Sequence, residues 1–373
     1  MKVAHIVSTF YPHLGGMGEV CLLEADALSS RGFETTVFSL RYPKMQYRDE
    51  LFSFRVERLS AILKFGDAGW IGTLAEKLEG FDIVHFHFPF YGAEKAVIDA
   101  KKKYGFKLVV TYHMDAQVKG IKKLMRDFLD FIYGKKLFEV ADKVLYVDEE
   151  RFRGFRFFNE IIKLKSIYLP NAVDVNIFKP EKTDLTKSLL EKYAQNKIIL
   201  FVGNLLPVKN LEVLIRAMKG ISKEAILLII GGGYAEKKYK KMVRESDLQN
   251  RVFFYGEVRN KEELSKIYNA ATVVCVPSFY ESFSLSAVEA LACGIPVIGN
   301  NIPGIRGRIA NGVDGILLPE NTVEKWQDAI NSVVEYTGEQ RNIIAEKARQ
   351  KVLLGYSIEM HIDKLIGIYE NIL

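Results

Sequence analysis

The most informative stretch of the chain reads PSFYESFSLSAVEALACGIPVI, residues 277–298. A proline ends a run of apolar residues, a loop follows, and an apolar helical pattern begins near Ser284. Gly294 then stops the helix before a second apolar run. This order predicts one unit of a parallel α/β sheet, because a helix has to carry the chain back before the next strand can run parallel to the first.

The same alternation extends in both directions from this stretch. In the N-terminal half we expect strands at 3–8, 35–40, 82–86, 107–112 and 143–147, and helices at 20–31, 92–103 and 120–139. In the C-terminal half we expect strands at 197–202, 225–230, 251–254, 272–276, 295–298 and 315–318, and helices at 209–219, 234–246, 261–270, 284–293 and 322–336.

Two series of βα units predict two doubly wound α/β domains. We place the N-terminal domain at 1–175, the C-terminal domain at 176–355, and a terminal helix at 356–373, with a turn-rich hinge at 169–174. Ligands of open α/β sheets bind beyond the carboxyl ends of the strands, so we expect one cleft between the domains.

Composition favours a globular chain with two cores. The chain has 373 residues, of which 49% are hydrophobic. Its three cysteines, Cys21, Cys275 and Cys293, lack the spacing of a zinc site, so we expect reduced core thiols. The apolar run after Met1 is too short for a signal peptide, and no later run approaches the ~20 residues of a membrane span. We therefore expect a cytoplasmic protein.

Basic residues concentrate in one segment, although the formal net charge is only +6. Residues 95–136 hold eleven Lys and Arg against four Asp and Glu, a local excess of +7. A solvated basic face and a patch that faces anionic lipid, on the inner face of a membrane, are both open interpretations. No recognisable binding motif accompanies the charge, so we expect no nucleic-acid partner.

The second half of this basic segment mixes basic and apolar residues, as an interfacial helix does. The residues concerned are Lys119, Lys122, Lys123, Leu124, Arg126, Phe128 and Phe131. The same apolar spacing would also serve an ordinary helix that faces the core.

Two strand ends carry glycine, and one of them is followed by a cation. Gly203 comes directly after the apolar strand at 197–202, and Lys209 opens the next helix. Glycine allows a phosphate to approach the backbone and lysine supplies a mobile positive charge, which suits a diphosphate. A surface lysine is the alternative, although the helix dipole disfavours a cation there.

Gly15 and Gly16 follow the first strand in a loop that is too long for the dinucleotide fingerprint. However, they open a helix, and the N-terminus of a helix attracts anions.

Two glutamates flank the start of the apolar helix near Ser284. Glu281 lies in the loop, and Glu289 lies eight residues later in the middle of the helix. The helix is apolar on nearly every side, so Glu289 should be largely buried and should need hydrogen-bond donors. Ribose hydroxyls are one source of donors, and a neighbouring lysine is the other.

The tract at 277–298 resembles the E-x7-E signature of the retaining GT-B glycosyltransferases of family four. Further matches are the Gly15-Gly16 loop, Thr111-Tyr112-His113, Pro170-Asn171-Ala172-Val173-Asp174 with Phe178, Gly203 with Lys209, and the terminal helix after Tyr356-Ser357. The resemblance implies two Rossmann-like domains facing across a cleft, with the C-terminal helix crossing back to the N-terminal domain. It also implies retaining transfer of a hexosyl unit from a nucleotide diphosphate sugar, a UDP- or GDP-sugar, to a hydroxyl acceptor.

The resemblance implies a role for each matching residue. Glu281 would bind hydroxyls of the transferred sugar, Glu289 the nucleotide ribose, and Lys209 the diphosphate. His113 would face the sugar and the leaving phosphate. Other residues of the donor site would be Gly15, Gly16, Gly203, Asn204, Phe283, Ser284 and Leu285. His85 and His87 also lie at the end of a predicted strand. They are either substrate contacts or structural histidines.

The chain departs from the family pattern at three places. Asn204 stands where the family has arginine, so half of the cationic grip on the diphosphate is missing or is supplied by Arg306 or Arg308. The usual Glu-Gly-Phe-Gly reads Glu281-Ser282-Phe283-Ser284. The later glycine-rich element reads Pro303-Gly304-Ile305-Arg306-Gly307 and lacks its glutamate.

No Asp-x-Asp motif occurs in the chain, so we expect neither a metal nor another cofactor. Lys209 and helix ends would then stabilise the leaving diphosphate. Two other classes share the architecture: sugar-nucleotide epimerases, and proteins that bind a sugar nucleotide without catalysis.

Overall fold

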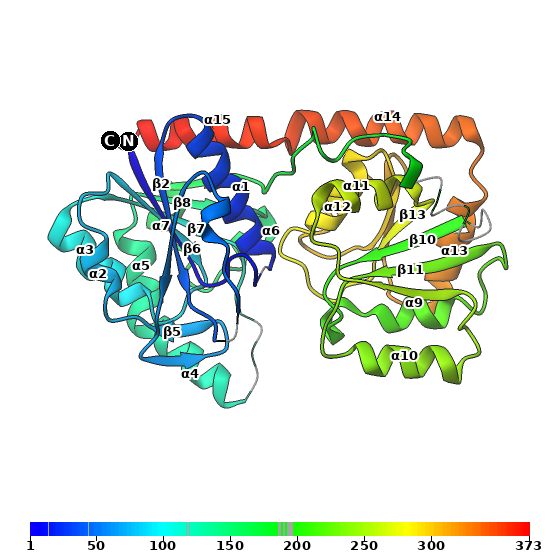
Figure 1. Cartoon of the computed structure of the whole chain (residues 1–373), viewed down its shortest axis with the longest axis horizontal. Helices are drawn as coiled ribbons and strands as arrows, with labels where there is room; N and C mark the ends of the chain where they lie inside the picture. Colours follow the sequence, from blue (N-terminus) through cyan, green and yellow to red (C-terminus); the bar gives the residue numbers. More distant parts are fainter. Residues whose placement is uncertain are drawn as a thin grey trace. The chain divides into compact units, whose positions relative to one another are not determined.

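A computed structural model describes residues 1–13, 15–43, 45–116, 118, 120–185, 188, 191 and 197–373, without the side chains of Phe65 and Lys122. The chain divides into two compact units. Unit 1 comprises residues 1–171 and 358–373, and unit 2 comprises residues 172–357. Each unit has its own parallel sheet, which confirms the predicted pair of doubly wound α/β domains (Figure 1).

The sheet of unit 1 has the strand order β3-β2-β1-β6-β7-β8-β9. Its strands are β1 (Lys2–Val7), β2 (Glu34–Leu40), β3 (Arg55–Leu59), β6 (Ile83–Phe88), β7 (Lys107–Tyr112), β8 (Lys143–Tyr146) and β9 (Ser166–Tyr168). All six pairings are parallel. Alternate residues of each strand therefore serve two different cores.

Helices cover both faces of this sheet. On one face the core joins Ile6, Phe86 and Val110 to α2 (Leu74–Lys77), α3 (Glu94–Tyr104) and α5 (Lys135–Val140). On the other face, α1 (Gly16–Ser30) packs on β1 and β2, and α15 (Ile358–Glu370) packs beside α1 (Figure 1). Unit 1 also contains α6 (Glu149–Arg153) and α7 (Glu160–Leu164).

Unit 1 differs from the sequence prediction at several places, including the short helices α2, α6 and α7, which were not predicted. The edge strands β3 and β9 were not predicted, and neither was the hairpin of β4 (Leu63–Phe65) and β5 (Ala68–Trp70). The predicted helix at 120–139 is helical from Ile121 to Val140, but a π-helical turn at Asp130–Gly134, which was not predicted, separates α4 (Ile121–Leu129) from α5. Asp130 in that turn is buried and pairs with Arg156 at 2.7 Å, a long-range contact that helical periodicity does not encode.

The sheet of unit 2 has the order β12-β11-β10-β13-β14-β15 and is also parallel. Its strands are β10 (Lys197–Val202), β11 (Ala225–Ile230), β12 (Val252–Gly256), β13 (Val273–Val276), β14 (Val297–Asn300) and β15 (Gly315–Leu318). Its helices include α9 (Leu211–Ala217), α10 (Glu236–Glu245), α11 (Lys261–Ala270), α12 (Leu285–Ala292), α13 (Val323–Val334) and α14 (Gly338–Gly355). Helices α9, α10 and α13 share one core with β10 and β11, and α12 packs against β13 and β14. The sequence prediction missed α14.

The last helix returns to the first unit, as the family resemblance implied. Ile362, Leu365 and Tyr369 of α15 are buried among residues of β1, β6, β7 and β8. The chain therefore enters unit 1 twice, and its C-terminal residues belong to the core built by its N-terminal ones. Among the described residues, no helix is both long and apolar enough to cross a bilayer.

Replacing Leu365 by alanine should destabilise unit 1 by about 2–5 kcal/mol, the range for deleting a fully buried leucine side chain. Trp70 lies in unit 1 and Trp326 in unit 2, so urea unfolding followed by Trp70 fluorescence in a Trp326→Phe background reports on unit 1. Leu354 of α14 is 67% exposed, and Leu354→Ala is the matched control. Equal, small effects of both changes would contradict the role of α15 in the core of unit 1.

Candidate functional site

The loops after β10 and β13 meet in unit 2. These strands are neighbours in the sheet, and the backbone N–H of Phe279 donates to the carbonyl of Val208 at 2.9 Å. Lys209 ends a short 3₁₀ turn, Pro207–Lys209, and its Nζ lies 2.5 Å from Oε1 of Glu281. The hydroxyl of Ser278 donates to the same oxygen at 2.8 Å. Two residues 72 positions apart in the chain thus form one ion pair, with Glu281 buried and Lys209 part-exposed.

Close backbone packing beside this ion pair requires glycine. A Cβ atom on Gly231 would lie 2.1 Å from the carbonyl oxygen of Gly203, and one on Gly233 would lie 2.6 Å from that of Leu205. Gly304 has φ +82°, and a Cβ there would lie 2.3 Å from the carbonyl oxygen of Glu281. Sequence reasoning named Gly203 but missed Gly231 and Gly233, although a Gly-Gly-Gly run directly after a strand was a usable signal.

Helix α12 begins at Leu285, and Ser284 is its N-cap. Ser284 has φ 65°, the left-handed region that the family pattern fills with glycine, at a cost of about 1–2 kcal/mol. Its buried hydroxyl has no hydrogen-bond partner within the described part of the chain. The first backbone N–H groups of a helix have no acceptors inside the helix, and the helix dipole makes this end positive. Ser284 and Leu285 therefore lie where an anion is favoured.

Glu289 is buried inside α12 and already has partners in the protein. Tyr268 donates to its Oε2 at 2.8 Å, and Lys261 Nζ lies 3.5 Å from its Oε1. The lysine partner that sequence reasoning left open is therefore present. Both partners come from α11, so the orientation of the Glu289 carboxylate is fixed within unit 2.

Two asparagines hold the loop that carries Glu281, and sequence reasoning missed both. The Asn300 side chain donates to the carbonyls of Pro277 and Ser278 at 2.8 and 2.9 Å, and Asn321 donates to Pro277 at 3.2 Å. Asn300 ends β14, next to β13 in the sheet. Its place at the carboxyl end of a strand was the available signal.

The two arginines proposed to replace the family arginine lie in different surroundings. Arg308 is 2% exposed, and its guanidinium stacks 4.1 Å from the ring centre of Phe283 while its Nε donates to the Phe283 carbonyl at 3.3 Å. Arg306 is exposed and donates to the side chain and carbonyl of Asn301. Asn204 is also exposed. Arg308 thus contacts the loop at 281–284 through Phe283.

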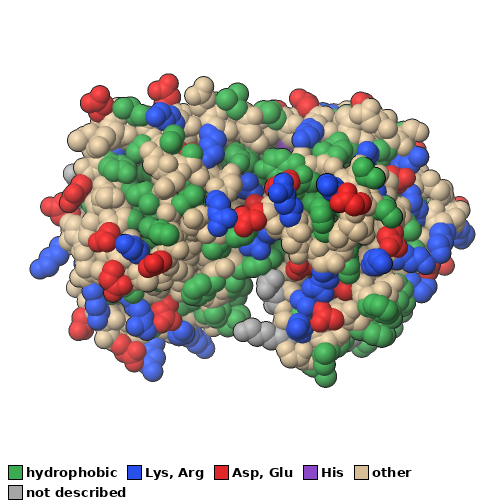
Figure 2. Space-filling model, turned by 180° about the vertical axis from the view of Figure 1, so that it is seen from behind, with side chains coloured by type: hydrophobic (Ala, Val, Ile, Leu, Met, Phe, Trp, Pro, Cys, Tyr) green, Lys and Arg blue, Asp and Glu red, His purple; other side chains and the backbone are tan. Residues whose placement is uncertain are grey.

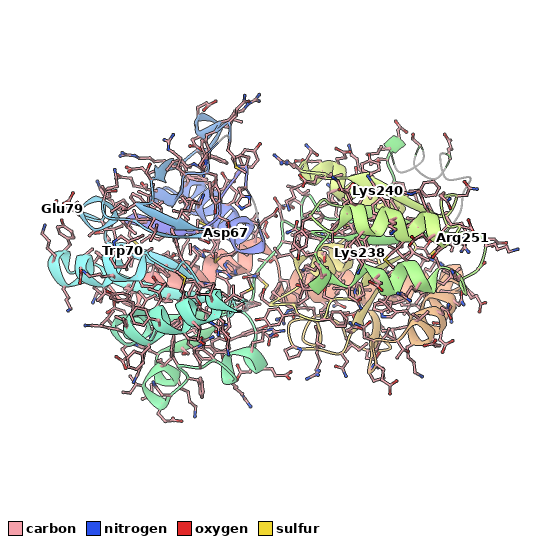
Figure 3. The ribbon with its side chains drawn as sticks, turned by 90° about the horizontal axis from the view of Figure 1, so that it is seen from below. Asp67, Trp70, Glu79, Lys238, Lys240 and Arg251 are labelled. Atoms are coloured by element: carbon pink, nitrogen blue, oxygen red, sulfur yellow. The ribbon has the colours of Figure 1, made fainter. Side chains whose placement is uncertain are left out.

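The remaining predicted site residues belong to unit 1. Gly15 is the N-cap of α1, Gly16 is its first residue, and His113 follows β7. Asp67 lies in the turn of the β4–β5 hairpin (Figure 3). In the loop before α1, His13 Nε2 lies 3.2 Å from Asp67, and Tyr42 also donates to Asp67. That loop is therefore held by a hairpin that sequence reasoning did not predict.

His85, His87 and His113 of unit 1 are buried and neutral. Burial lowers the pKa of His113 to about 4 and that of His85 to about 3, against an opposing effect of the Glu24 charge, and it holds the pKa of His87 well below its usual range. His85 donates to or accepts from Tyr369 and Thr111, each at 2.6 Å. His85 and His87 are fully buried, which favours the structural interpretation over substrate contact.

The geometry of unit 2 can bind an anion and polar hydroxyls. A lysine, a helix N-terminus and a glycine-rich backbone supply positive charge and close approach, while the Glu281 and Glu289 carboxylates accept hydrogen bonds. The three cysteines are free and buried, so they offer no exposed nucleophile. Among the described residues, one cluster has the spacing of metal ligands: His5, Glu24, His85 and His87 in unit 1.

Two family models match the sequence and together cover most of it. The model described as "Glycosyl transferases group 1" matches residues 183–351, and "Glycosyltransferase Family 4" matches residues 14–176. The D-inositol 3-phosphate glycosyltransferase of Mycolicibacterium smegmatis is 28% identical over 263 residues, which are 68% of this chain and 60% of that protein. The enzyme of that name from Mycobacterium tuberculosis (strain F11) is 25% identical over 301 residues, 78% of this chain and 62% of that protein. The matched parts thus span less than two thirds of these relatives.

Solved structures share the fold along the whole chain. Sucrose-phosphate synthase from Thermosynechococcus elongatus has a TM-score of 0.82 at 22% identity, covering 100% of this chain and 98% of that one. Anabaena HepE, solved in complex with UDP-glucose, has a TM-score of 0.79 at 18% identity and full coverage of both chains.

Lys209→Met should weaken binding of a nucleoside diphosphate about 10- to 100-fold, because a charged hydrogen bond to phosphate is worth about 1.5–3 kcal/mol. Lys238→Met is the matched control, since Lys238 of α10 in the same unit is exposed and pairs with Glu212 (Figure 3). Calorimetric titration measures both. An affinity that Lys209→Met leaves unchanged would remove the diphosphate from this loop.

Proposed function

Because the chain belongs to the group 1 glycosyltransferases of family four, we propose that it transfers a hexosyl unit from a nucleotide diphosphate sugar to a hydroxyl acceptor, with retention of configuration. The observation that carries this proposal is the Lys209–Glu281 ion pair beside the N-terminus of α12. A cation and a carboxylate lie there within one loop cluster. HepE was solved with UDP-glucose, which supports a UDP-sugar as the first donor to test.

In the proposed complex, Lys209 and the backbone N–H groups of Ser284 and Leu285 stabilise the charge that develops on the leaving diphosphate. Glu281 accepts hydrogen bonds from the transferred sugar. Glu289 accepts hydrogen bonds from the ribose, while Tyr268 keeps its carboxylate oriented. The acceptor hydroxyl attacks from the face that the diphosphate leaves, and the leaving phosphate takes its proton. We propose that this electrostatic stabilisation operates without a metal.

Nucleoside diphosphate release from a UDP- or GDP-hexose in the presence of hydroxyl acceptors should persist in EDTA, since Lys209 and the helix N-terminus supply the charge stabilisation. The assay is a panel of donors and acceptors with coupled detection of the released nucleotide, and Lys209→Met is the control for release by a contaminant. Activity that EDTA abolishes and magnesium or manganese restores would reject metal independence. Conversion of the sugar nucleotide without release would indicate an epimerase, and binding without turnover would indicate a non-catalytic protein.

We further propose that α4 and the π-helical turn after it attach unit 1 to an anionic membrane surface, on the inner face where anionic lipids concentrate. Four large apolar side chains of this segment are exposed, at 75% for Ile121, 69% for Leu124, 63% for Phe128 and 84% for Phe131. A core-facing helix would bury them, so the interfacial interpretation of this segment gains support.

The described charges of this segment have different surroundings. Lys123 is exposed, whereas Arg126 donates to Asp127 and to the carbonyl of Ala116. The interpretation of Arg126 as a lipid-facing cation is therefore weakened. Lys119 lies outside the described residues, and so does the side chain of Lys122. On the face drawn in Figure 2, basic and acidic side chains are interspersed, in keeping with a modest net charge.

The protein should sediment with anionic vesicles and much less with neutral ones, and added salt should weaken this binding. Phe128→Ser with Phe131→Ser should abolish sedimentation by removing the apolar contact. Lys122→Ser with Lys123→Ser should weaken it about 30-fold, at about 1 kcal/mol for each lysine. Leu354→Ser, at an exposed position of unit 2, is the control. Sedimentation that ignores lipid charge even at low salt would restore a solvated basic face.

A further inference from the structure

A row of buried imidazoles connects His113 to a buried ion pair in unit 1. Five of the six histidines of the chain lie together, on β1, β6 and α15 and directly after β7. His5 is the register partner of His85, and His87 is the partner of Thr111, two residues before His113. Because alternate residues share a face of the sheet, these side chains continue the face that carries the apolar core against α15.

The inner end of the row is charged. His361 Nδ1 lies 2.8 Å from the carbonyl oxygen of Pro170, and its Nε2 lies 2.9 Å from Oε1 of Glu24. Burial alone would raise the pKa of Glu24, but the hydrogen bond from His361 and the neighbouring imidazoles lower it to about 2, so this carboxyl is ionised. Both partners of His361 are then acceptors only, and both of its ring nitrogens must carry protons.

Three neutral imidazoles, those of His5, His87 and His113, form a hydrogen-bonded chain that begins beside this ion pair and ends at His113. His5 Nδ1 and His87 Nε2 are 3.0 Å apart, and His87 Nδ1 and His113 Nε2 are 3.0 Å apart. A neutral imidazole has one N–H and one lone pair, so the protons must all point the same way along the chain. Either each histidine donates outward from His5 to His113, or each donates inward.

The Nε2 nitrogen of His5, at the inner end of this chain of three imidazoles, decides between these two orders. His5 Nε2 is buried and has no hydrogen-bond partner within the described residues. In the inward order this nitrogen carries an N–H without an acceptor, and in the outward order it keeps a bare lone pair. Orphaned buried N–H groups are rarer in proteins than under-satisfied acceptors. Glu24 Oε2 lies 3.7 Å from both His5 Nδ1 and His87 Nε2, so it favours a proton between them in either order.

We propose that His5 and His87 are positioning residues that fix His113 as the tautomer with its proton on Nδ1. With Nε2 of His113 facing His87, Nδ1 is the nitrogen left to meet a ligand, and 4% of the residue remains exposed. His113 then offers a hydrogen-bond donor, and a ligand atom beside it must be an acceptor. The identity of this ligand atom rests on the proposed function: it is an oxygen of the transferred sugar or of the leaving phosphate.

A metal ion is the competing explanation for the same cluster. His5, Glu24, His85 and His87 have the spacing of ligands, and Glu24 Oε2 has no hydrogen-bond partner among the described residues. However, the nitrogens that would bind a metal already pair with each other or with Tyr369 at 2.6–3.0 Å. These hydrogen bonds favour the proton chain, and metal analysis of the purified protein tests the point.

The direct test is the imidazole ¹⁵N spectrum of the full chain at neutral pH, without substrate. We expect the proton of His113 on Nδ1, opposite to the tautomer favoured in water. His87→Asn places an amide N–H where Nδ1–H lies and should retain this tautomer, whereas His87→Leu should lose it. His85→Asn perturbs the same buried cluster outside the chain of three and is the matched control.

In the transfer assay, His87→Leu should lower kcat about tenfold, the value of one ordinary hydrogen bond, while nucleotide affinity stays unchanged and His87→Asn restores turnover. A wild-type His113 with its proton on Nε2, or a tautomer unaffected by His87→Leu in folded protein, overturns the proposal. One equivalent of bound zinc lost on His5→Ala also overturns it. The spectra need no substrate, so they fail or succeed independently of the proposed transferase activity.

Discussion

A parallel sheet brings the carboxyl ends of its strands to one edge, and the candidate site of unit 2 depends on this constraint. Lys209 and Glu281 follow the adjacent strands β10 and β13, so they meet at one edge of the sheet. Asn300, at the end of β14, donates a hydrogen bond to the loop that carries Glu281. Glycines at 231 and 304 let the neighbouring backbones come close enough for these contacts. The ion pair is therefore a product of strand order as much as of residue type.

Buried polar groups in both units are stabilised by partners rather than avoided. In unit 2, Glu289 sits within an apolar helix with a tyrosine and a lysine from α11. In unit 1, an acidic residue and five histidines occupy the polar end of a sheet face whose other end is a hydrophobic core. Since an unpaired polar group in such a place costs on the order of 1–3 kcal/mol, the hydrogen bonds restrict where each proton can sit.

The two ends of the chain are linked through the same face of unit 1. Helix α15 supplies both the apolar contacts of Leu365 and the charged partner His361, so one helix completes the core and the imidazole cluster. This explains why the histidine network spans positions 5 to 361. The proposed membrane attachment uses the exposed apolar side chains of α4. It therefore does not involve α15, which completes the core and the imidazole cluster.

Sequence alone determined the two doubly wound domains and the family. Apolar periodicity and strand-end glycines are local signals, so they can be recognised from residues that are neighbours in the sequence. It also located Glu281, Glu289, Lys209 and His113 as candidates. It did not reveal the edge strands β3 and β9, because these strands are short and their residues show little alternation. It also did not reveal the π-helical turn that contains Asp130, the partner of Arg156. Only the tertiary structure decided which partners meet: Lys209 with Glu281, Arg308 with Phe283, and His5 with His87. The physical reason is that hydrogen bonds and ion pairs depend on distances of about 3 Å between residues far apart in sequence, which strand order and helix packing set and local sequence does not.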